Sequence, residues 1–195
     1  MAQPVMKGSR TEKNLAMAFA GESMARNRYT FFASKAKKEG YEQISAIFLE
    51  TAENEREHAK RFLKLMDGTG NPVHVQIDIP AIKIGSTLEN LKFAAEGELE
   101  EHSTAYPHMA AIAEQEGFTE VARVFRAVAE VEAAHEQRFR TLAKQVETGT
   151  VFKRDRDVRW KCRNCGYIFI GKEPPAECPA CGHSRAFYEM AEVLE

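Results

Sequence analysis

The chain contains two copies of a Glu-x-x-His pattern, and this repeat limits the available folds more than any other feature of the sequence. Glu55 precedes His58 by three positions, and Glu132 precedes His135 in the same way 77 residues later. Residues three apart on a helix share one face, and in each copy a phenylalanine expected to face inward follows the histidine by four positions. An ionised carboxylate is costly to bury unless it is paired or binds a metal. The repeat therefore predicts two helices that bring acids and imidazoles into the protein interior.

Apolar residues recur at helical spacing through most of the chain. They predict four long helices, at about residues 9–39, 42–66, 86–117 and 119–147. The second and third helices are joined by about twenty residues (67–85), which is too long for a tight turn between antiparallel neighbours. One long crossover connection is typical of ferritin-like four-helix bundles, so we predict a mainly α fold of that class. Residues 73–77 alternate in polarity, which leaves a short strand open within the connection.

The first and third predicted helices also carry acids in phase with their apolar residues. These acids are Glu22, Glu98 and Glu101. A di-iron or di-manganese centre in a helix bundle takes one Glu from each of two helices and a Glu-x-x-His pair from each of the other two, which is the pattern of this chain. Oxygen-rich ligands with two imidazoles favour iron or manganese over zinc. We predict a pair of iron ions in the bundle.

The two halves of the repeat differ by one residue. Glu22 precedes Gly40 by 18 positions, whereas Glu98 precedes Gly117 by 19. A helix can absorb one extra residue as a π-bulge, and such bulges often lie at functional sites. We therefore predict a π-bulge in the third helix, near Tyr106.

All four cysteines lie near the C-terminal end of the chain, in two Cys-x-x-Cys knuckles. They are Cys162, Cys165, Cys178 and Cys181. Their spacing indicates a tetrahedral metal site of four thiolates, and by itself it does not distinguish iron from zinc. An iron ion beside a di-iron bundle has an evident use in electron transfer, so we predict one iron ion here. We expect nearby aromatic residues to pack around this site: Trp160, Tyr167, Phe169, Phe187 and Tyr188.

The composition excludes several classes of partner. A formal net charge of −2 gives no reason to expect nucleic acid or an anionic membrane as a partner. No apolar run approaches the ~20 residues that span a bilayer, and residues 1–10 lack the apolar segment of a secretory signal. Together with the clustered cysteines, these features predict a cytoplasmic protein. We expect a bundle at residues 1–148, a linker at 149–158 and a four-cysteine domain at 159–195.

Several stretches resemble the sequences of rubrerythrins, and the resemblance extends from Lys7 to Glu195. The stretches are residues 8–14, 19–23, 25–29, 55–61 and 162–167. The resemblance implies a ferritin-like di-iron domain joined to a rubredoxin-like domain, with a non-haem peroxidase activity that reduces hydrogen peroxide to water in oxidative-stress defence. It also implies that electrons arrive through the four-cysteine iron site from an external NAD(P)H-dependent reductase or a rubredoxin. The protein is expected to be a homodimer whose subunits pair head to tail.

The resemblance further assigns metal ligands in the bundle. Glu55 and Glu132 match carboxylates that bridge the two iron ions. Glu22, Glu98 and Glu101 match terminal ligands of the pair.

The remaining assignments concern the residues expected to take part in catalysis. His135 matches the imidazole on the second iron. His58 matches a ligand that the first iron takes up on reduction, when it leaves Glu101. Tyr29 and Tyr106 match tyrosines that form hydrogen bonds to the ligands.

The residues leave two other interpretations open. The same kind of bundle oxidises ferrous iron in ferritins, so the chain could be a ferroxidase or iron-handling protein. A structural bundle that carries a zinc ribbon would instead be a binding module. One residue, His102, departs from what we expect at its position in rubrerythrins, and this departure leaves the set of ligands intact.

Overall fold

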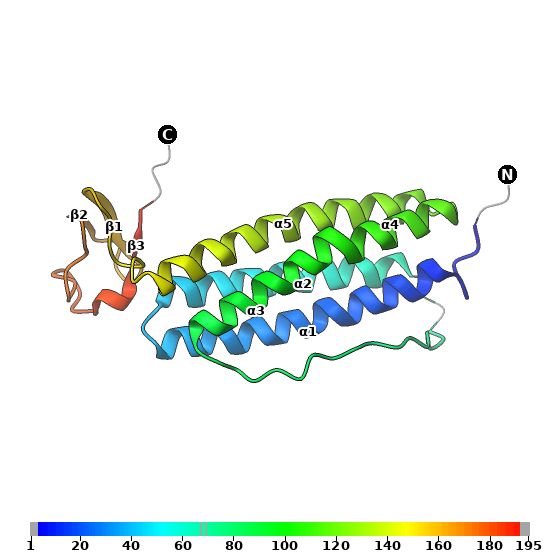
Figure 1. Cartoon of the computed structure of the whole chain (residues 1–195), viewed down its shortest axis with the longest axis horizontal. Helices are drawn as coiled ribbons and strands as arrows, with labels where there is room; N and C mark the ends of the chain where they lie inside the picture. The colour runs from blue at the N-terminus through cyan, green and yellow to red at the C-terminus, as the bar shows by residue number, and fades with distance from the viewer. Residues whose placement is uncertain (1–3, 67, 69, 192–195) are drawn as a thin grey trace.

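The computed structural model describes residues 4–66, 68 and 70–191, in which a helical bundle is followed by a small β-sheet domain (Figure 1). The helices are α1 (Arg10–Lys38), α2 (Glu42–Leu65), α3 (Thr87–Glu100), α4 (Tyr106–Gln115) and α5 (Thr119–Glu147). α1 packs mainly on α2, while α3 and α4, which follow one another along a single arm of the bundle, pack on α5. This arrangement confirms the predicted mainly α four-helix bundle. The outermost residues of the two predicted domains, 1–3 and 192–195, lie outside the described residues.

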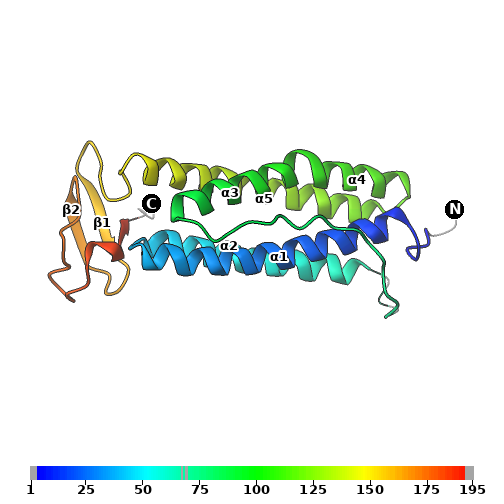
Figure 2. The ribbon, with the colours of Figure 1, turned by 60° about the horizontal axis from the view of Figure 1, so that its bottom comes forward.

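The connection between α2 and α3 runs along the bundle beside α1 (Figure 2). This confirms the predicted long crossover. Residues 70–86 form no helix or strand, so the short strand left open at residues 73–77 does not form. Isoleucines of the connection line a groove with Phe31 of α1 instead.

The two halves of the bundle cap each other's helices. The carboxylate of Glu39, at the end of α1, accepts a hydrogen bond of 2.8 Å from the backbone N–H of Thr87 at the start of α3. In the equivalent place, the carboxylate of Glu116 accepts a bond of 2.9 Å from the N–H of Thr11 at the start of α1. The first N–H groups of a helix have no partner within the helix. Each half therefore supplies a partner to the other.

The extra residue in the third helix forms a π-helical segment, Glu101–Ala105, between α3 and α4. On the N-terminal side of this segment the two halves of the repeat are offset by 76 positions, since Glu22 corresponds to Glu98. On its C-terminal side the offset is 77 positions, since Tyr29 corresponds to Tyr106. The insertion is thus confined to the stretch between Glu98 and Tyr106. The predicted π-bulge is confirmed.

The bundle core consists of two hydrophobic clusters, each with aromatic rings at its centre. One contains Phe48 and Phe139, with ring centres 5.2 Å apart, and the other contains Phe62 and Phe125, with ring centres 5.1 Å apart. Along α2 and α5 the buried acids lie between these clusters. A polar layer in the middle of the bundle is therefore enclosed by an apolar layer on each side.

The C-terminal domain is a three-stranded antiparallel sheet in the order β2-β1-β3. Its strands are β1 (Val158–Cys162), β2 (Ile168–Gly171) and β3 (Tyr188–Met190), and a 3₁₀ turn covers Arg185–Phe187. Trp160 and Tyr188 are fully buried beside Cys162 and Cys178, with Phe169 and Phe187 packed against them. Tyr167 differs from the expectation, because it is exposed in the turn before β2.

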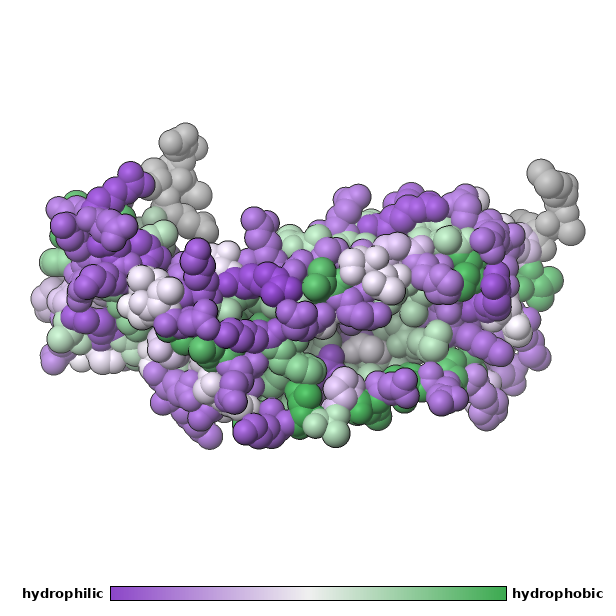
Figure 3. All heavy atoms as spheres, viewed as in Figure 1, coloured by the Kyte–Doolittle hydropathy of each residue, from purple (hydrophilic) through white to green (hydrophobic). Residues whose placement is uncertain are grey.

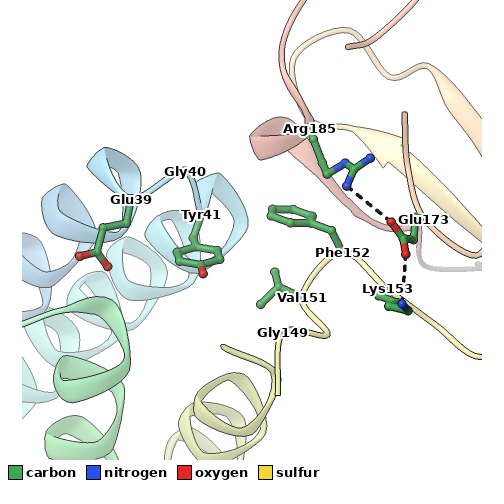
Figure 4. A pocket seen from close by; sticks show the side chains of 9 residues that line it. All are labelled: Glu39, Gly40, Tyr41, Gly149, Val151, Phe152, Lys153, Glu173 and Arg185. Carbon is green, nitrogen blue, oxygen red and sulfur yellow. Dashed lines mark ion pairs between the residues drawn. The ribbon is translucent and has the colours of Figure 1, made fainter. Parts of the chain in front are cut away.

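A short segment joins the sheet domain to the end of the bundle (Figure 4). Val151 is buried in the bundle core, and the ring of Phe152 stacks on Tyr41 with centres 6.2 Å apart. On the other side, Glu173 forms ion pairs with Lys153 at 3.4 Å and with Arg185 at 3.6 Å. These contacts surround a pocket of about 430 Å³ between the two parts. Within the described part of the chain, no helix combines the length and apolar composition of a membrane span.

Replacing Phe48 by Ala is expected to lower the free energy of unfolding by about 3–5 kcal/mol, because large-to-small changes in a core leave a cavity. Phe48 is 0% exposed, whereas the neighbouring Leu49 is 47% exposed. Chemical denaturation of Phe48→Ala should therefore show a large loss, and Leu49→Ala should stay within about 0.5–1 kcal/mol of the unsubstituted protein. Equal losses for the two variants would contradict this description of the core.

Candidate metal centres

Six acidic and imidazole side chains from α1, α2, α3 and α5 meet in the polar layer of the bundle. They form two overlapping groups, each with one donor atom per residue and all such atoms within 4.8 Å of one another. The first group is Glu22, Glu55, His58 and Glu132, and the second is Glu55, Glu98, Glu132 and His135. Glu55 and Glu132 belong to both groups. The structure thus brings together the two repeated pairs and one acid from each remaining arm.

The two shared carboxylates each direct one oxygen toward each histidine. Glu55 Oε2 lies 2.9 Å from His58 Nδ1, and its Oε1 lies 3.3 Å from His135 Nδ1. Glu132 does the same, with Oε1 at 2.9 Å from His58 Nδ1 and Oε2 at 2.7 Å from His135 Nδ1. In this geometry each carboxylate can offer one oxygen to each of two neighbouring metal positions.

Two buried tyrosines hold the acids that are not shared. Tyr29 on α1 donates its O–H to Glu98 on α3 at 2.5 Å, and Tyr106 on α4 donates its O–H to Glu22 on α1. Burial, followed by the charge of nearby carboxylates, raises the pKa of both tyrosines well above its ordinary value. Both therefore keep their protons and act as donors. The tyrosine-bound oxygens lie within 4 Å of the imidazoles, at 3.8 Å from His58 Nδ1 for Glu22 and at 3.9 Å from His135 Nδ1 for Glu98.

The charges in this layer are unfavourable without cations. Burial and then neighbouring acids raise the pKa of Glu22 and of Glu98 well above the ordinary value. Burial alone would lower the pKa of the imidazoles, but Glu132 and Glu55 outweigh it and raise the pKa of His58 to about 10 and that of His135 to about 9. In the metal-free protein, protons thus occupy the site in place of metal ions.

The residues fit a pair of metal ions. In the described part of the chain, the buried atoms without a hydrogen-bond partner outside the cluster include Oε2 of Glu22 and of Glu98, both oxygens of Glu55 and of Glu132, and Nδ1 of His58 and of His135. Buried polar atoms are rarely left without a partner, and these converge on the two overlapping groups. Four carboxylates also balance the charge of two divalent cations.

Glu101 and His102, on the π segment, lie outside the two groups. Glu101 is half-buried, and burial together with the charges of Glu132 and Glu55 raises its pKa to about 8. His102 Nε2 lies 2.7 Å from Glu136 Oε2 and so points away from the cluster. The assignment of Glu101 as a ligand remains a prediction.

The four cysteine sulfurs also form a compact group, with all Sγ atoms within 4.8 Å of one another. Cys162 Sγ is 3.8 Å from Cys181 Sγ, and Cys165 Sγ is 3.7 Å from Cys178 Sγ. These distances are far longer than a disulfide bond. A tetrahedron with metal–sulfur bonds of about 2.3 Å has edges of about 3.8 Å, so the sulfurs fit a tetrahedral metal ion.

Backbone turns build this cage from the two knuckles. The N–H of Gly166 bonds to the carbonyl of Cys162 at 2.8 Å, and the N–H of Gly182 bonds to that of Cys178 at 2.9 Å. Both glycines have positive φ, 80° and 70°, a conformation that costs glycine little. A hydrogen bond from the backbone N–H of His183 lowers the pKa of Cys181 to about 6, which favours the thiolate that a metal requires.

Two family models match this chain. The model described as "Rubrerythrin" matches residues 13–143, and the model described as "Rubrerythrin, rubredoxin-like domain" matches residues 160–189. The chain belongs to the rubrerythrin family. The rubrerythrin of Porphyromonas gingivalis is 56% identical over 184 residues, which cover 94% of this chain and 91% of that protein. The rubrerythrin of Nitratidesulfovibrio vulgaris is 49% identical over 188 residues, which cover 96% and 97%.

Solved structures with a fold similar to that of this rubrerythrin-family chain include a nigerythrin and a bacterioferritin. A nigerythrin structure described as fully reduced and all ferrous is 30% identical, with a TM-score of 0.63 over 96% of this chain and 92% of that one. The bacterioferritin of Desulfovibrio desulfuricans is 17% identical, with a TM-score of 0.58 over 73% of this chain and 87% of that one. The second likeness concerns the fold alone and supports the ferritin-like class.

The geometry and the family together establish the cofactors. The ferritin-like bundle has a di-iron carboxylate and histidine site, and the C-terminal domain has a four-cysteine rubredoxin-like iron site. Both predicted cofactors are confirmed, and the interpretation of the bundle as purely structural is set aside. The rubrerythrin-family assignment implies an iron-dependent redox function.

Sequence reasoning missed one polar contact of this site. Asn54 Oδ1 lies 3.3 Å from His135 Nε2, across from α2 to α5. The available signal was a mismatch in the repeat, in which Asn54 corresponds to Val131.

Acidification is expected to weaken metal binding to the bundle, because metal ligands must be deprotonated. The raised pKa values, about 10 for His58 and about 9 for His135, mean that protons are bound below these values and must leave when metal enters. Calorimetric titration with Co²⁺ in buffers of different ionisation enthalpy, at pH 6 and pH 8, should show proton release and a lower affinity at pH 6. Binding without proton release would contradict the proposed occupancy of the site by protons.

Proposed function

We propose that this protein is a peroxidase that reduces hydrogen peroxide to two molecules of water, with two electrons and two protons, in defence against oxidative stress. The observation that carries the proposal is the pair of donor groups that share Glu55 and Glu132, since such an arrangement holds two metal ions side by side. When bound, a ferrous pair supplies both electrons for cleavage of the peroxide O–O bond, so that no hydroxyl radical is released.

The proposed ligand roles follow the contacts of each side chain. Glu55 and Glu132 are bridging ligands, because each directs one oxygen at each imidazole. Glu22 and Glu98 are terminal ligands, each held in place by a hydrogen bond from one of the two tyrosines. His135 completes the second group of donors.

Glu101 and His58 are proposed to alternate as ligands of one metal position. His58 Nδ1 faces the cluster, while Glu101 lies outside both groups of donors. This arrangement suits the reduced state, because a neutral imidazole suits ferrous iron, whereas a carboxylate suits the harder ferric ion. In the oxidised state Glu101 would hold this metal position in place of His58. Glu101 begins the π segment, where the regular α-helical hydrogen-bond ladder is interrupted.

The cysteine cage is proposed to receive electrons from an NAD(P)H-dependent reductase or a rubredoxin and to pass them on one at a time. Its two sides differ in accessibility. Cys162 and Cys178 are buried against the aromatic core, whereas Cys165 is exposed and Cys181 half-buried. A partner protein can therefore approach the cage from the side of Cys165.

A head-to-tail homodimer is proposed to bring this cage to a di-iron site. His135 lies 12 residues before the end of α5 at Glu147, which is about 18 Å along the helix axis. The β-sheet domain that carries the cage lies beyond that end (Figure 1). Electron transfer through protein weakens steeply with distance, so a second copy is the better acceptor. Hydrophobic side chains gather where the crossover connection follows α1 (Figure 3), among them Phe31, Ile79 and Ile84, which are 52%, 72% and 54% exposed.

We propose three parts of the chain: the bundle at residues 1–148, a linker at 149–158 and the four-cysteine domain at 159–195. α5 ends at Glu147, and β1 begins at Val158. A cytoplasmic location is proposed because a reducing compartment keeps the four cysteines available as thiolates.

Replacing Glu55 by Ala should lower the rate of peroxide turnover by about 100-fold or more, because both donor groups lose a shared ligand. The ferric–thiolate absorption of the cysteine cage should persist. Glu57→Ala serves as a matched control on the same helix, since Glu57 is 50% exposed and forms a surface pair with Lys60. Undiminished turnover in Glu55→Ala would overturn the assignment, and oxidation of excess ferrous iron without peroxide turnover would favour the ferroxidase interpretation.

Mixed dimers test the route of the electrons. A Glu55→Ala subunit keeps an intact cage, and a Cys178→Ser subunit keeps an intact di-iron site, so neither homodimer should turn over with an external donor. In a head-to-tail dimer purified with two different tags, one cage faces one intact di-iron site, and about half of the normal turnover should return. An inactive mixed dimer would show that electrons stay within one chain.

A further inference from the structure

The two histidines of the di-iron site differ in what holds their outer nitrogens. Both turn Nδ1 toward the shared carboxylates. Nε2 of His135 has a partner, the side-chain oxygen of Asn54, at 3.3 Å. For Nε2 of His58, the described part of the chain provides no hydrogen bond. The two imidazoles also differ in exposure, with side chains 14% exposed for His58 and 5% for His135.

This difference originates at a pair of equivalent positions in the repeat. Asn54 precedes Glu55 by one residue and His58 by four, and Val131 precedes Glu132 and His135 in the same way. Because the two halves of the repeat are equivalent, Val131 is expected opposite His58, as Asn54 lies opposite His135. A valine side chain cannot accept a hydrogen bond. One imidazole is tethered and the other is not.

The tether has a defined chemical effect. An amide oxygen accepts only from a nitrogen that carries hydrogen, so the contact fixes the proton of neutral His135 on Nε2 and leaves the lone pair on Nδ1, facing the cluster. Partners of this kind orient metal-bound histidines and raise their basicity. Asn54 is half-buried on α2. Because His135 lies on α5, the contact also joins α2 to α5 beside the site.

We propose that Asn54 is a positioning residue that keeps His135 permanently on its metal ion, and that Val131, by offering no acceptor, leaves His58 free to move. The pair makes the two metal positions chemically different although their carboxylates are nearly symmetric. The second half of this inference rests on the proposed exchange of His58 and Glu101, whereas the first half concerns metal affinity and stands without it.

Metal titration of the full-length protein tests the tether separately from peroxidase activity. One equivalent of Zn²⁺ first fills the cysteine cage, and Co²⁺ is then added, with binding followed by calorimetry and by the cobalt absorption bands. Asn54→Leu, which keeps the size of the side chain and removes its oxygen, should weaken one of the two Co²⁺ steps by about 10–100-fold. Asn54→Asp keeps an acceptor and should restore that step.

The reciprocal variant tests the role of the valine. Val131→Asn supplies an acceptor opposite His58 and should strengthen the other Co²⁺ step, without the loss seen for Asn54→Leu. Unchanged isotherms for Asn54→Leu, or an equal loss in Asn54→Asp, would overturn the tether. A Val131→Asn isotherm that matches the unsubstituted protein would overturn the role of Val131. These outcomes are read without peroxide, so they stay interpretable even if the proposed peroxidase activity fails.

Discussion

The burial of carboxylates in an apolar bundle is the constraint on which the rest of the structure depends. Glu22, Glu55, Glu98 and Glu132 are each no more than 1% exposed, and an aromatic layer on either side keeps water from them. Such groups are tolerated only when they are neutralised or bound to cations. The same arrangement that weakens the metal-free bundle therefore makes it a strong metal binder, and metal binding contributes directly to the stability of the fold.

Much of this organisation follows from the sequence because helical periodicity is rigid. Three positions between an acid and a histidine place both on one face, and the same spacing in two helices predicts two such faces. The count of residues between Glu98 and Gly117, one more than in the first half, locates the π segment because a regular helix cannot take up an extra residue without changing its ladder. The length of the crossover likewise excludes a simple hairpin.

Contacts between helices that are far apart in sequence could not be predicted in the same way. The periodicity of one helix fixes which face a side chain occupies, and it does not fix its rotamer or its neighbour on another helix. Asn54 reaches His135, and His102 reaches Glu136, only because α2, α5 and the π segment are placed by packing. Whether Glu101 faces the cluster depends on a backbone irregularity of a single turn, and the exposure of Tyr167 depends on the path of a tight loop.

The reciprocal caps have a consequence for how the two helix pairs hold together. The start of α1 has its own N-cap in Ser9 and the start of α3 has one in Ser86, and to these the opposite pair adds Glu116 and Glu39. The metal ligands are divided between the pairs in the same way. The association of the two pairs therefore supports the helix ends and assembles the metal site at the same time.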